Sequence, residues 1–218
     1  MAVAIAFFDG RGYLSDTWEL KLNVIVLDRD GVINYDSDSY IKSVSEWIPI
    51  EGSIEAVAEF SRAGFRIVVV TNQSGLGRGL LKETILEDIH SKLESKVESL
   101  GGKIDGIFFC PHHPKKNCEC RKPKIGLLKK AEHSLQASLK NSFFVGDSYT
   151  DLQCAVNFGL TPILVRSGKG PITESRLHQE REAEVLRLKS GGMPNQNFNL
   201  HDTAVYNDLA HFSRFVLP

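Results

Sequence analysis

The 218-residue sequence has no long hydrophobic run and no excess of charge of one sign. No apolar stretch reaches the roughly 18 residues that a membrane helix needs, so no transmembrane segment is predicted. The apolar run at residues 2–8 has no positive flank and is closed by Asp9, which is not the pattern of a signal peptide. With 26 basic and 27 acidic residues, a chain-wide binder of nucleic acid is disfavoured. We expect a cytoplasmic protein without nucleic-acid or membrane partners.

Cysteine is also scarce, and the four cysteines are not spread as in a secreted disulfide framework. Three of them, Cys110, Cys118 and Cys120, lie within eleven residues, together with His112 and His113. The spacing C-x-H followed by C-x-C supplies three thiolates and an imidazole, a soft ligand set that suits a closed, structural Zn²⁺ site. Spacing alone does not choose between the two histidines.

A disulfide is the alternative use of these cysteines. Cys118 and Cys120 are too close in the sequence to pair comfortably with each other, and the other two bridges would leave an odd thiol. The fourth cysteine, Cys154, stands alone in an apolar helical pattern, where a small buried side chain is expected. Zinc is therefore the favoured interpretation of the other three.

Short β-branched runs alternate with helical patterns along the chain. Five runs are continuous and apolar, at residues 24–27, 67–70, 107–109, 143–145 and 163–165. Such runs are typical of central strands in a parallel sheet covered by helices. Between them, apolar residues recur at helical spacing, as at Ile85, Ile89 and Leu93. We predict a doubly wound α/β fold around one core, with a mostly parallel sheet of five or more strands.

Two regions fall outside this alternation, so the chain is divided into three segments. Residues 1–22 are predicted as an N-terminal extension without assigned structure, and residues 23–168 as the α/β domain with a zinc loop at 110–120. From Gly168 the sheet pattern stops, and residues 169–218 are predicted as a helical tail. Leu177 to Leu188 follow the spacing of a charged amphipathic helix, and residues 202–212 that of a last short helix. We expect a monomer.

Polar residues follow the predicted strands at their carboxyl ends, where ligands bind to such sheets. Asp28 and Asp30 follow the first run, Thr71 with two amides follows the second, and Asp147 follows the fourth. Carboxylates gathered in one crevice repel one another unless a cation neutralises them, and hard oxygen ligands suit Mg²⁺. A Mg²⁺–carboxylate site beside hydrogen-bond donors suits phosphoryl transfer.

Four motifs resemble, in order, those of the haloacid dehalogenase-like (HAD) phosphohydrolases. They are D-R-D-G-V at residues 28–32, T-N-Q-S-G at 71–75, R-K-P at 121–123 and G-D-S-Y-T-D at 146–151. Within that superfamily the chain resembles the D-glycero-D-manno-heptose 1,7-bisphosphate 7-phosphatases over about residues 23–168. The resemblance implies a sugar-bisphosphate phosphatase in the synthesis of ADP-heptose for lipopolysaccharide. No large insertion separates the first three strands, so no large cap domain is expected.

The resemblance also implies roles for the strand-end residues. Asp28 would be the nucleophile that forms an aspartyl-phosphate, and Asp30 would be the general acid and then the general base. Thr71 and Lys122 would hold the transferring phosphoryl oxygens. Mg²⁺ would be bound by Asp28, Asp147 and the backbone carbonyl of Asp30.

For the zinc loop, the family pattern selects His112 as the ligand that completes the three cysteines. Arg121 and Lys122 follow the last ligand, Cys120, directly. Fixing that cysteine would therefore also fix two cations that meet a substrate phosphate. The loop is the positive patch of a near-neutral chain, which suits a phosphorylated sugar.

Substrate contacts are implied for the loops around the same edge of the sheet. The acidic segment after the first strand would touch the sugar, and Arg121 would meet a phosphate. Arg78 has two interpretations, a contact to a distal phosphate or a solvated loop residue. The candidate substrate-binding residues are Asp36, Ser37, Asp38, Ser39, Asn72, Gln73, Ser74, Arg78 and Arg121.

The sequence also departs from the family pattern. Ser148 stands where many members carry lysine, so a cation is missing directly after the fourth-motif aspartate. The five residues between His112 and Cys118 are a length common in histidinol-phosphate phosphatases, and that activity is the alternative function. A phosphoacceptor signalling domain also places acids, threonine and lysine at strand ends. Such a domain would need neither Asp30 as acid and base nor the zinc loop.

Overall fold

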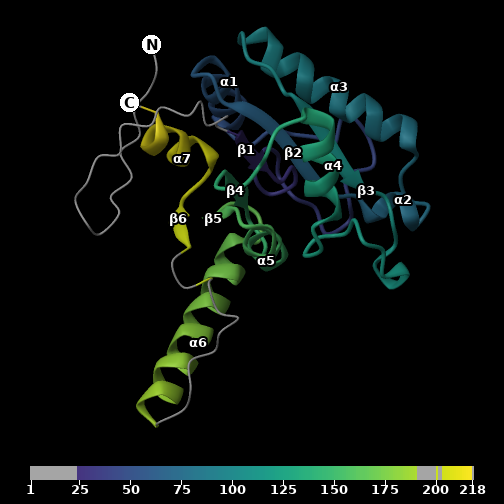
Figure 1. Ribbon diagram of the computed structural model, residues 1–218. Helices are drawn as coiled ribbons and strands as arrows, with labels where there is room; N and C mark the ends of the chain where they lie inside the picture. Colours follow the sequence, from purple (N-terminus) through teal and green to yellow (C-terminus); the bar gives the residue numbers. More distant parts are fainter. Residues whose placement is uncertain (1–23, 191–199, 201–202, 218) are drawn as a thin grey trace.

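The computed structural model describes residues 24–190, 200 and 203–217, so the predicted extension at residues 1–22 lies outside the described residues. The described chain forms a six-stranded sheet with parallel neighbours throughout, in the order β3-β2-β1-β4-β5-β6 (Figure 1). The strands are β1 (Val24–Leu27), β2 (Arg66–Asn72), β3 (Gly106–Cys110), β4 (Phe143–Gly146), β5 (Thr161–Val165) and β6 (Ala204–Tyr206). The chain winds outward from β1 in both directions, which confirms the predicted doubly wound fold.

Helices cover both faces of this sheet. They are α1 (Ser53–Arg62), α2 (Ser74–Gly77), α3 (Glu83–Ser99), α4 (Gly126–Leu135), α5 (Tyr149–Phe158), α6 (Gly170–Lys189) and α7 (Leu209–Val216), with a short 3₁₀ turn at Pro114–Lys116. Helix α1 contacts α3 and α7 on one face, while α4 and α5 pack on the other. Helix α6 points away from the sheet (Figure 1). Among the described helices, none has the length and hydropathy required to cross a membrane.

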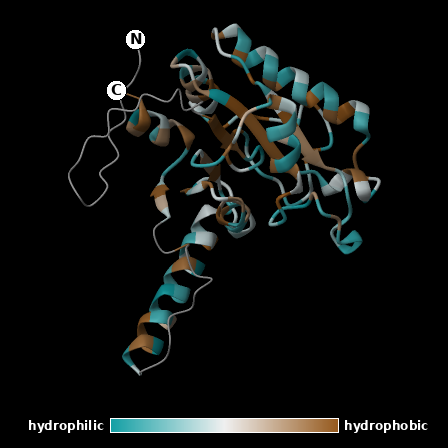
Figure 2. Ribbon diagram, viewed as in Figure 1, coloured by the Kyte–Doolittle hydropathy of each residue, from teal (hydrophilic) through white to brown (hydrophobic). Residues whose placement is uncertain are grey.

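The central strands are continuous apolar runs because their two faces are buried in different cores. In β1, Ile25 and Leu27 belong to the core that contains α1, α3 and α7. Val24 and Val26 belong to the core beneath α4 and α5. Figure 2 shows these strands mostly in the hydrophobic colour, whereas α3 and α6 are mixed. Burial on both faces fixes the register of the strands and therefore the position of the residues at their carboxyl ends.

The structure corrects three expectations about the sheet and the tail. β3 is an edge strand and not a central one, and its residues 106–109 are only half-buried. The sheet does not stop at Gly168, because β6 pairs with β5. The last helix is α7, at Leu209–Val216 instead of residues 202–212. The sixth strand escaped prediction because its three residues, of which one is buried, are too few to show a strand period.

Candidate active site

Three carboxylates meet at the carboxyl ends of the central strands. Asp28 follows β1, Asp147 follows β4, and Asp151 lies in the first turn of α5. All three are buried, and one carboxylate oxygen from each lies within 4.8 Å of the others. We call these three residues the carboxylate cluster. Asp28 and Asp147 were predicted as metal ligands, whereas Asp151 was not.

Close backbone approach brings the cluster together. Gly31 has a φ of 85°, and a Cβ at this position would overlap the carboxylate of Asp147. A Cβ at Gly168, with a φ of 57°, would overlap the same carboxylate oxygen and also the Cα of Gly31. The backbone N–H of Lys169 donates to Asp147 Oδ2 at 2.7 Å, so the start of α6 is tied to the cluster.

The electrostatics of the cluster favour a bound cation. Burial raises the pKa of Asp28 to about 7, opposed by Lys122 and reinforced by Asp151 and Asp30. Burial, followed by the charges of Asp151 and Asp28, raises the pKa of Asp147 to about 8. Three buried carboxylates beside one lysine are under-neutralised, and their hard oxygen donors fit Mg²⁺. The residues at this edge of the sheet could therefore hold a metal ion.

Lys122 is buried at the centre of this arrangement. Its Nζ lies 2.9 Å from Asp28 Oδ1 and 2.6 Å from Asp151 Oδ1, and it donates to the Val70 carbonyl at 2.8 Å. Burial would lower the pKa of Lys122, but the two carboxylates raise it, so the amine is charged. Asp151 thus holds the predicted phosphate-binding lysine in place. The G-D-x-x-x-D spacing was the signal for this role.

Asp30 is surrounded by donors that sequence reasoning did not assign to it. Its carboxylate accepts from Arg29 Nε and Nη2, both at 3.0 Å, from Asn34 Nδ2 at 2.9 Å and from Gln73 Nε2 at 2.8 Å. Arg29 is fully buried. Burial alone would raise the pKa of Asp30, but the Arg29 charge and these hydrogen bonds lower it. Asp30 is therefore held as a carboxylate in a fixed orientation.

The second motif supplies both a hydroxyl and two amides to this edge. Thr71 is buried, and its Oγ1 accepts from Gln73 Nε2 at 3.0 Å. Asn72 pairs with the Lys122 backbone, accepting from its N–H at 3.1 Å and donating to its carbonyl at 3.3 Å. Ser74 is buried at the start of α2. Both amides therefore hold protein groups, and their expected contacts to substrate stay predictions.

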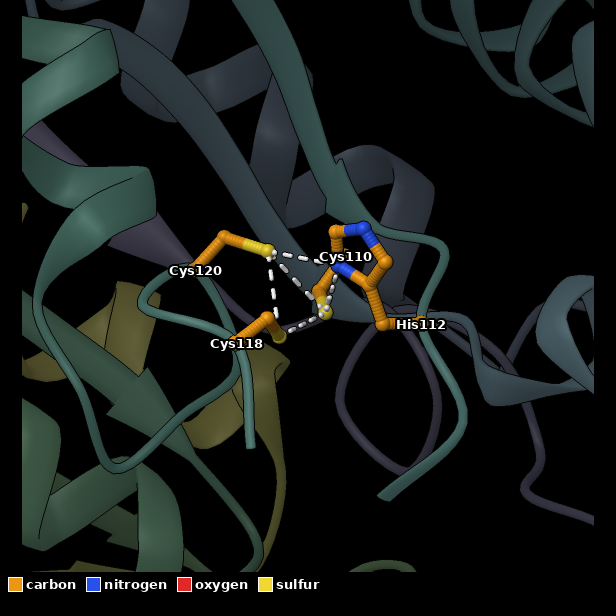
Figure 3. A group of neighbouring side chains, drawn as sticks. All are labelled: Cys110, His112, Cys118 and Cys120. Carbon is orange, nitrogen blue, oxygen red and sulfur yellow. Dashed lines mark hydrogen bonds between the residues drawn. The ribbon is translucent and has the colours of Figure 1, made fainter. Parts of the chain in front are cut away.

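The cysteine–histidine cluster lies at the carboxyl end of β3, whose last residue is Cys110. Figure 3 shows Cys110, His112, Cys118 and Cys120 pointing toward one another. The three sulfurs are 3.3–3.5 Å apart, and His112 Nδ1 lies 3.1 Å from Cys120 Sγ and 3.7 Å from Cys110 Sγ. All three cysteines are free thiols, and the four ligand atoms are close enough for one Zn²⁺ to reach each at about 2.0–2.3 Å.

The choice of histidine follows from the local backbone. His113 lies at the N-terminus of the 3₁₀ turn, where its Nδ1 accepts from the Lys115 backbone N–H at 3.1 Å. His112 Nδ1 instead faces the thiols. The histidine that lies with the three cysteines is therefore His112, the one that the family pattern selects.

Arg121 and Lys122 follow Cys120 directly, and Lys122 connects the two clusters because its side chain reaches Asp28 and Asp151. The Arg121 side chain is half-buried, and its Nη1 is buried with no hydrogen-bond partner among the described residues. A guanidinium nitrogen without a partner, one residue before Lys122, suits an anionic ligand group.

The residues predicted to contact the substrate differ in how exposed their side chains are. Ser37, Asp38 and Ser39 are exposed, whereas Asp36 is half-buried and pairs with Lys169 Nζ at 2.9 Å. Arg78 is exposed, with its guanidinium 5.7 Å from the centre of the Tyr40 ring. The structure therefore brings a cation, Lys169, to this edge that the sequence did not single out.

Ser148 has a structural role at the position where a lysine was missing. Its Oγ and backbone N–H both donate to Asp151 Oδ2, at 2.6 and 3.0 Å, in a capping box that begins α5. The serine thereby orients the carboxylate that holds Lys122.

This arrangement of strand-end acids, lysine and threonine is that of a HAD-like hydrolase, and residues 119–187 match the HAD-hydrolase-like family model. The D-glycero-beta-D-manno-heptose-1,7-bisphosphate 7-phosphatase of Pseudomonas putida is 47% identical over 152 residues, covering 70% of this chain and 87% of that protein. The Bordetella bronchiseptica enzyme of the same name is 40% identical over 189 residues, 87% of this chain and 94% of that protein. The chain belongs to the family of these heptose-bisphosphate phosphatases and is a phosphoric monoester hydrolase.

Solved structures agree with this assignment. The D,D-heptose 1,7-bisphosphate phosphatase from B. bronchiseptica, complexed with magnesium and phosphate, superposes with a TM-score of 0.74 at 39% identity, covering 89% of this chain and 98% of that one. The corresponding protein from Burkholderia thailandensis gives a TM-score of 0.60 at 34% identity, covering 90% and 99%. The similarity therefore extends over nearly the whole length of both proteins.

Proposed function

We propose that this protein removes the C7 phosphate of D-glycero-D-manno-heptose 1,7-bisphosphate, in a Mg²⁺-dependent step of ADP-heptose synthesis for lipopolysaccharide. The observation that carries the proposal is the contact of the buried Lys122 with Asp28 and Asp151 at the carboxyl ends of the strands. Relatives named as phosphatases of this substrate are up to 47% identical to the chain. A charged lysine beside a buried carboxylate provides one nucleophile and one stabilising cation for a phosphoryl group.

In the proposed reaction, Asp28 attacks phosphorus and forms an aspartyl-phosphate while the sugar alkoxide leaves. Lys122 Nζ, already 2.9 Å from Asp28 Oδ1, can stay beside the phosphoryl oxygens as negative charge moves onto them. Thr71 lies on the neighbouring strand and offers its hydroxyl to the same group. Water then hydrolyses the intermediate and frees Asp28.

Asp30 is proposed to protonate the leaving alkoxide and then to deprotonate the attacking water. Its hydrogen bonds from Arg29, Asn34 and Gln73 fix the direction of the carboxylate. These donors favour the ionised form, which is the form that deprotonates water, and they make the protonated form a stronger acid toward the alkoxide. The proton taken up from water is the one that the next alkoxide requires, so the two half-reactions balance.

Two metal ions complete the proposal, and the donor sets fit both. Asp28, Asp147 and the backbone carbonyl of Asp30 would hold Mg²⁺, with Asp151 close enough to replace or support one of them. A bound Mg²⁺ supplies positive charge to the phosphoryl oxygens. Zn²⁺ would be held by Cys110, His112, Cys118 and Cys120, which form a closed set without an open position.

Selectivity is proposed to come from the loops and cations around this edge. Arg121, with its unpartnered buried Nη1, would bind the phosphate that does not react, and Arg78 is a second candidate for the same role. Asp36 to Ser39 would recognise sugar hydroxyls. Binding energy from the remote phosphate would orient the reacting one. The cytoplasmic location and the monomeric state stay predictions.

The test is phosphate release from a panel that contains both anomers of the heptose bisphosphate and histidinol phosphate. We expect kcat/KM to be highest for a heptose bisphosphate, because histidinol phosphate carries a cation at the end that would face Arg121. A preference for histidinol phosphate would overturn the assignment.

A further inference from the structure

A buried chain of hydrogen bonds leads from a tryptophan outside the active site to the carboxylate of Asp30. Trp47, which is fully buried in the loop before α1, donates from its indole Nε1 to Asn34 Oδ1 at 2.8 Å. Asn34, also fully buried, donates from Nδ2 to Asp30 Oδ1 at 2.9 Å and to the Tyr35 carbonyl at 2.9 Å. One amide therefore connects the indole to the acid.

The chemistry of the indole fixes the orientation of this amide. An indole N–H can only donate, so the oxygen of Asn34 must face Trp47 and the nitrogen must face Asp30. With the amide turned the other way, two donors would meet at the indole and two acceptors at the carboxylate. Trp47 and the Tyr35 carbonyl, which can only accept, therefore determine together which atom Asn34 presents to Asp30.

Trp47 is in turn clamped by α3. Lys92 Nζ donates to the carbonyls of Val44 and Trp47, at 2.8 and 3.2 Å, and lies 5.4 Å from the centre of the indole ring. The loop that carries Trp47 is thereby tied to a helix of the core. The position of the indole is therefore fixed by its contacts within the fold.

A second chain reaches Asp30 from the same helix. Arg29 Nη1 lies 3.2 Å from His90 Nε2, while Arg29 Nε and Nη2 donate to the two oxygens of Asp30. A guanidinium only donates, so His90 Nε2 must be the acceptor and the ring must be neutral. Burial and the Arg29 charge lower the pKa of His90 to about 3, which is consistent with this state. His90 thus holds the guanidinium that holds Asp30.

We propose that Trp47 and His90 are positioning residues for Asp30, acting through Asn34 and Arg29, and that they serve the proton transfer to the leaving group. The inference rests on the proposed role of Asp30 as acid and base. Proton transfer to an alkoxide requires the acid within hydrogen-bond reach and correctly aimed. A carboxylate held by several donors meets that requirement, and loss of either chain would leave Asp30 with fewer fixed donors and therefore less well aimed.

Two substrates with different leaving groups can distinguish a misplaced Asp30 from a general loss of structure. A sugar alkoxide is a poor leaving group that needs a proton, whereas p-nitrophenolate leaves without one. The value of kcat/KM includes steps only up to departure of the leaving group, so the later hydrolysis of the phosphoenzyme does not enter. Misplacement of Asp30 should therefore lower kcat/KM for the heptose bisphosphate and spare p-nitrophenyl phosphate.

The experiment measures kcat/KM for these two substrates with Trp47→Phe, His90→Phe and Asp30→Asn. Both aromatic replacements keep a buried ring and remove one hydrogen bond. We expect each to lower kcat/KM for the heptose bisphosphate about tenfold, the size expected for one buried hydrogen bond, with less than about a twofold change for p-nitrophenyl phosphate. Phe212→Leu, a core change in α7 outside these chains, should move both substrates alike or not at all.

The outcomes are distinguishable. If Asp30→Asn loses the alkyl substrate selectively but Trp47→Phe and His90→Phe lower both substrates equally or neither, the positioning role is wrong while the function of Asp30 stands. If Asp30→Asn itself shows no selectivity between the substrates, its acid role is wrong and the positioning role falls with it. The double variant Asp30→Asn with Trp47→Phe should be no slower than Asp30→Asn on the alkyl substrate; a further selective loss would contradict the chain.

Discussion

The molecule has two clusters of metal-ligand residues that are built in opposite ways. The cysteine–histidine cluster draws all four members from eleven consecutive positions, the last residue of β3 and the loop after it, which contains a short 3₁₀ turn. The carboxylate cluster draws its members from the residues just after β1 and β4 and from α5, which are far apart in the sequence and are placed by the buried sheet. A local cluster needs a bound metal to fix its geometry, whereas a cluster on strand ends is placed by the core.

The two clusters are joined by three consecutive residues. Cys120 is a ligand in the first cluster, Arg121 follows it, and Lys122 reaches into the second, where it contacts Asp28 and Asp151. Asn72 also pairs with the Lys122 backbone from the neighbouring strand. We therefore expect the carboxylate cluster to carry out the chemistry and the cysteine–histidine cluster to fix the position of Arg121 and Lys122.

The largest expected effect comes from changing the carboxylate cluster alone. Asp28→Asn should abolish turnover, because an amide cannot serve as the nucleophile and binds Mg²⁺ more weakly. The variant should keep about one equivalent of zinc, since the other cluster is untouched. Phosphate release and metal analysis after dialysis measure both properties. Asp88→Asn, an exposed carboxylate on α3, is the matched control and should be fully active; near-normal turnover in Asp28→Asn would refute the mechanism.

Changing the cysteine–histidine cluster should have a smaller effect on rate and a larger effect on metal content. Cys120→Ser should lose zinc and lower kcat about 10–100-fold, because Arg121 and Lys122 are no longer held from the loop side. Zinc content and kcat are measured on the same preparation. Cys154→Ser changes the remaining buried cysteine, which donates to the Lys124 carbonyl, and should retain zinc. A fully folded protein that never contains zinc would contradict the proposal that zinc in this cluster fixes Arg121 and Lys122.

The pH dependence of the free energy of unfolding should show whether the carboxylate cluster is free of metal or holds Mg²⁺. The pKa of Asp28 is raised from 3.8 to about 7 and that of Asp147 from 3.8 to about 8, so between about pH 4 and 8 the folded protein binds more protons than the unfolded chain. The free energy of unfolding without Mg²⁺ should therefore fall as the pH rises through this range. Mg²⁺ favours the ionised carboxylates and should stabilise the protein more at pH 8 than at pH 6.

Thermal unfolding with and without Mg²⁺ at the two pH values measures this difference. At a concentration about 100 times its Kd, Mg²⁺ should add about 2.7 kcal/mol to the free energy of unfolding at pH 8. Asp147→Asn removes one of the titrating groups and should reduce the dependence on both pH and Mg²⁺. An equal increase in Tm at pH 6 and pH 8 would contradict the expectation.

The smallest effect is expected at the junction of the clusters. Arg121→Ala should lower kcat/KM for the heptose bisphosphate about tenfold, because the remote phosphate loses one charge-assisted contact. The ratio of kcat/KM for the heptose bisphosphate to kcat/KM for histidinol phosphate should therefore decrease. Arg78→Ala is the comparison variant. If Arg78 also binds a distal phosphate, this variant should lower the same ratio; if Arg78 is a solvated loop residue, the ratio should not change. An equal loss of both activities in Arg121→Ala would leave the phosphatase standing and remove this explanation of selectivity.

The difference between the clusters also explains what the sequence could predict. The cysteine–histidine cluster is local, so its members were visible from spacing, and the family pattern then selected His112 over His113. The five short apolar runs predicted five of the six strands, and the signal is continuous in β1 and β2 because both faces of these strands are buried. β6 could not be found this way, since its three residues mainly cover the edge of β5.

The partners of the carboxylates were harder to find because they depend on packing between distant segments. Arg29 is part of the first motif, but nothing in the sequence indicates that its side chain turns back onto Asp30. His90 carried the signal of a polar residue within an apolar helical pattern, and Trp47 that of an isolated aromatic residue. Both acquire their hydrogen bonds only when α3 and the loop before α1 are packed against β1.

The most direct measurement of the proposed activity is ³¹P NMR of the reaction with D-glycero-D-manno-heptose 1,7-bisphosphate and Mg²⁺. We expect the C7 phosphate signal to disappear as inorganic phosphate appears, with the C1 phosphate signal retained in the product. The same spectra with Asp28→Asn should not change with time. Loss of the C1 phosphate, or no release from either position while histidinol phosphate is hydrolysed, would contradict the proposal.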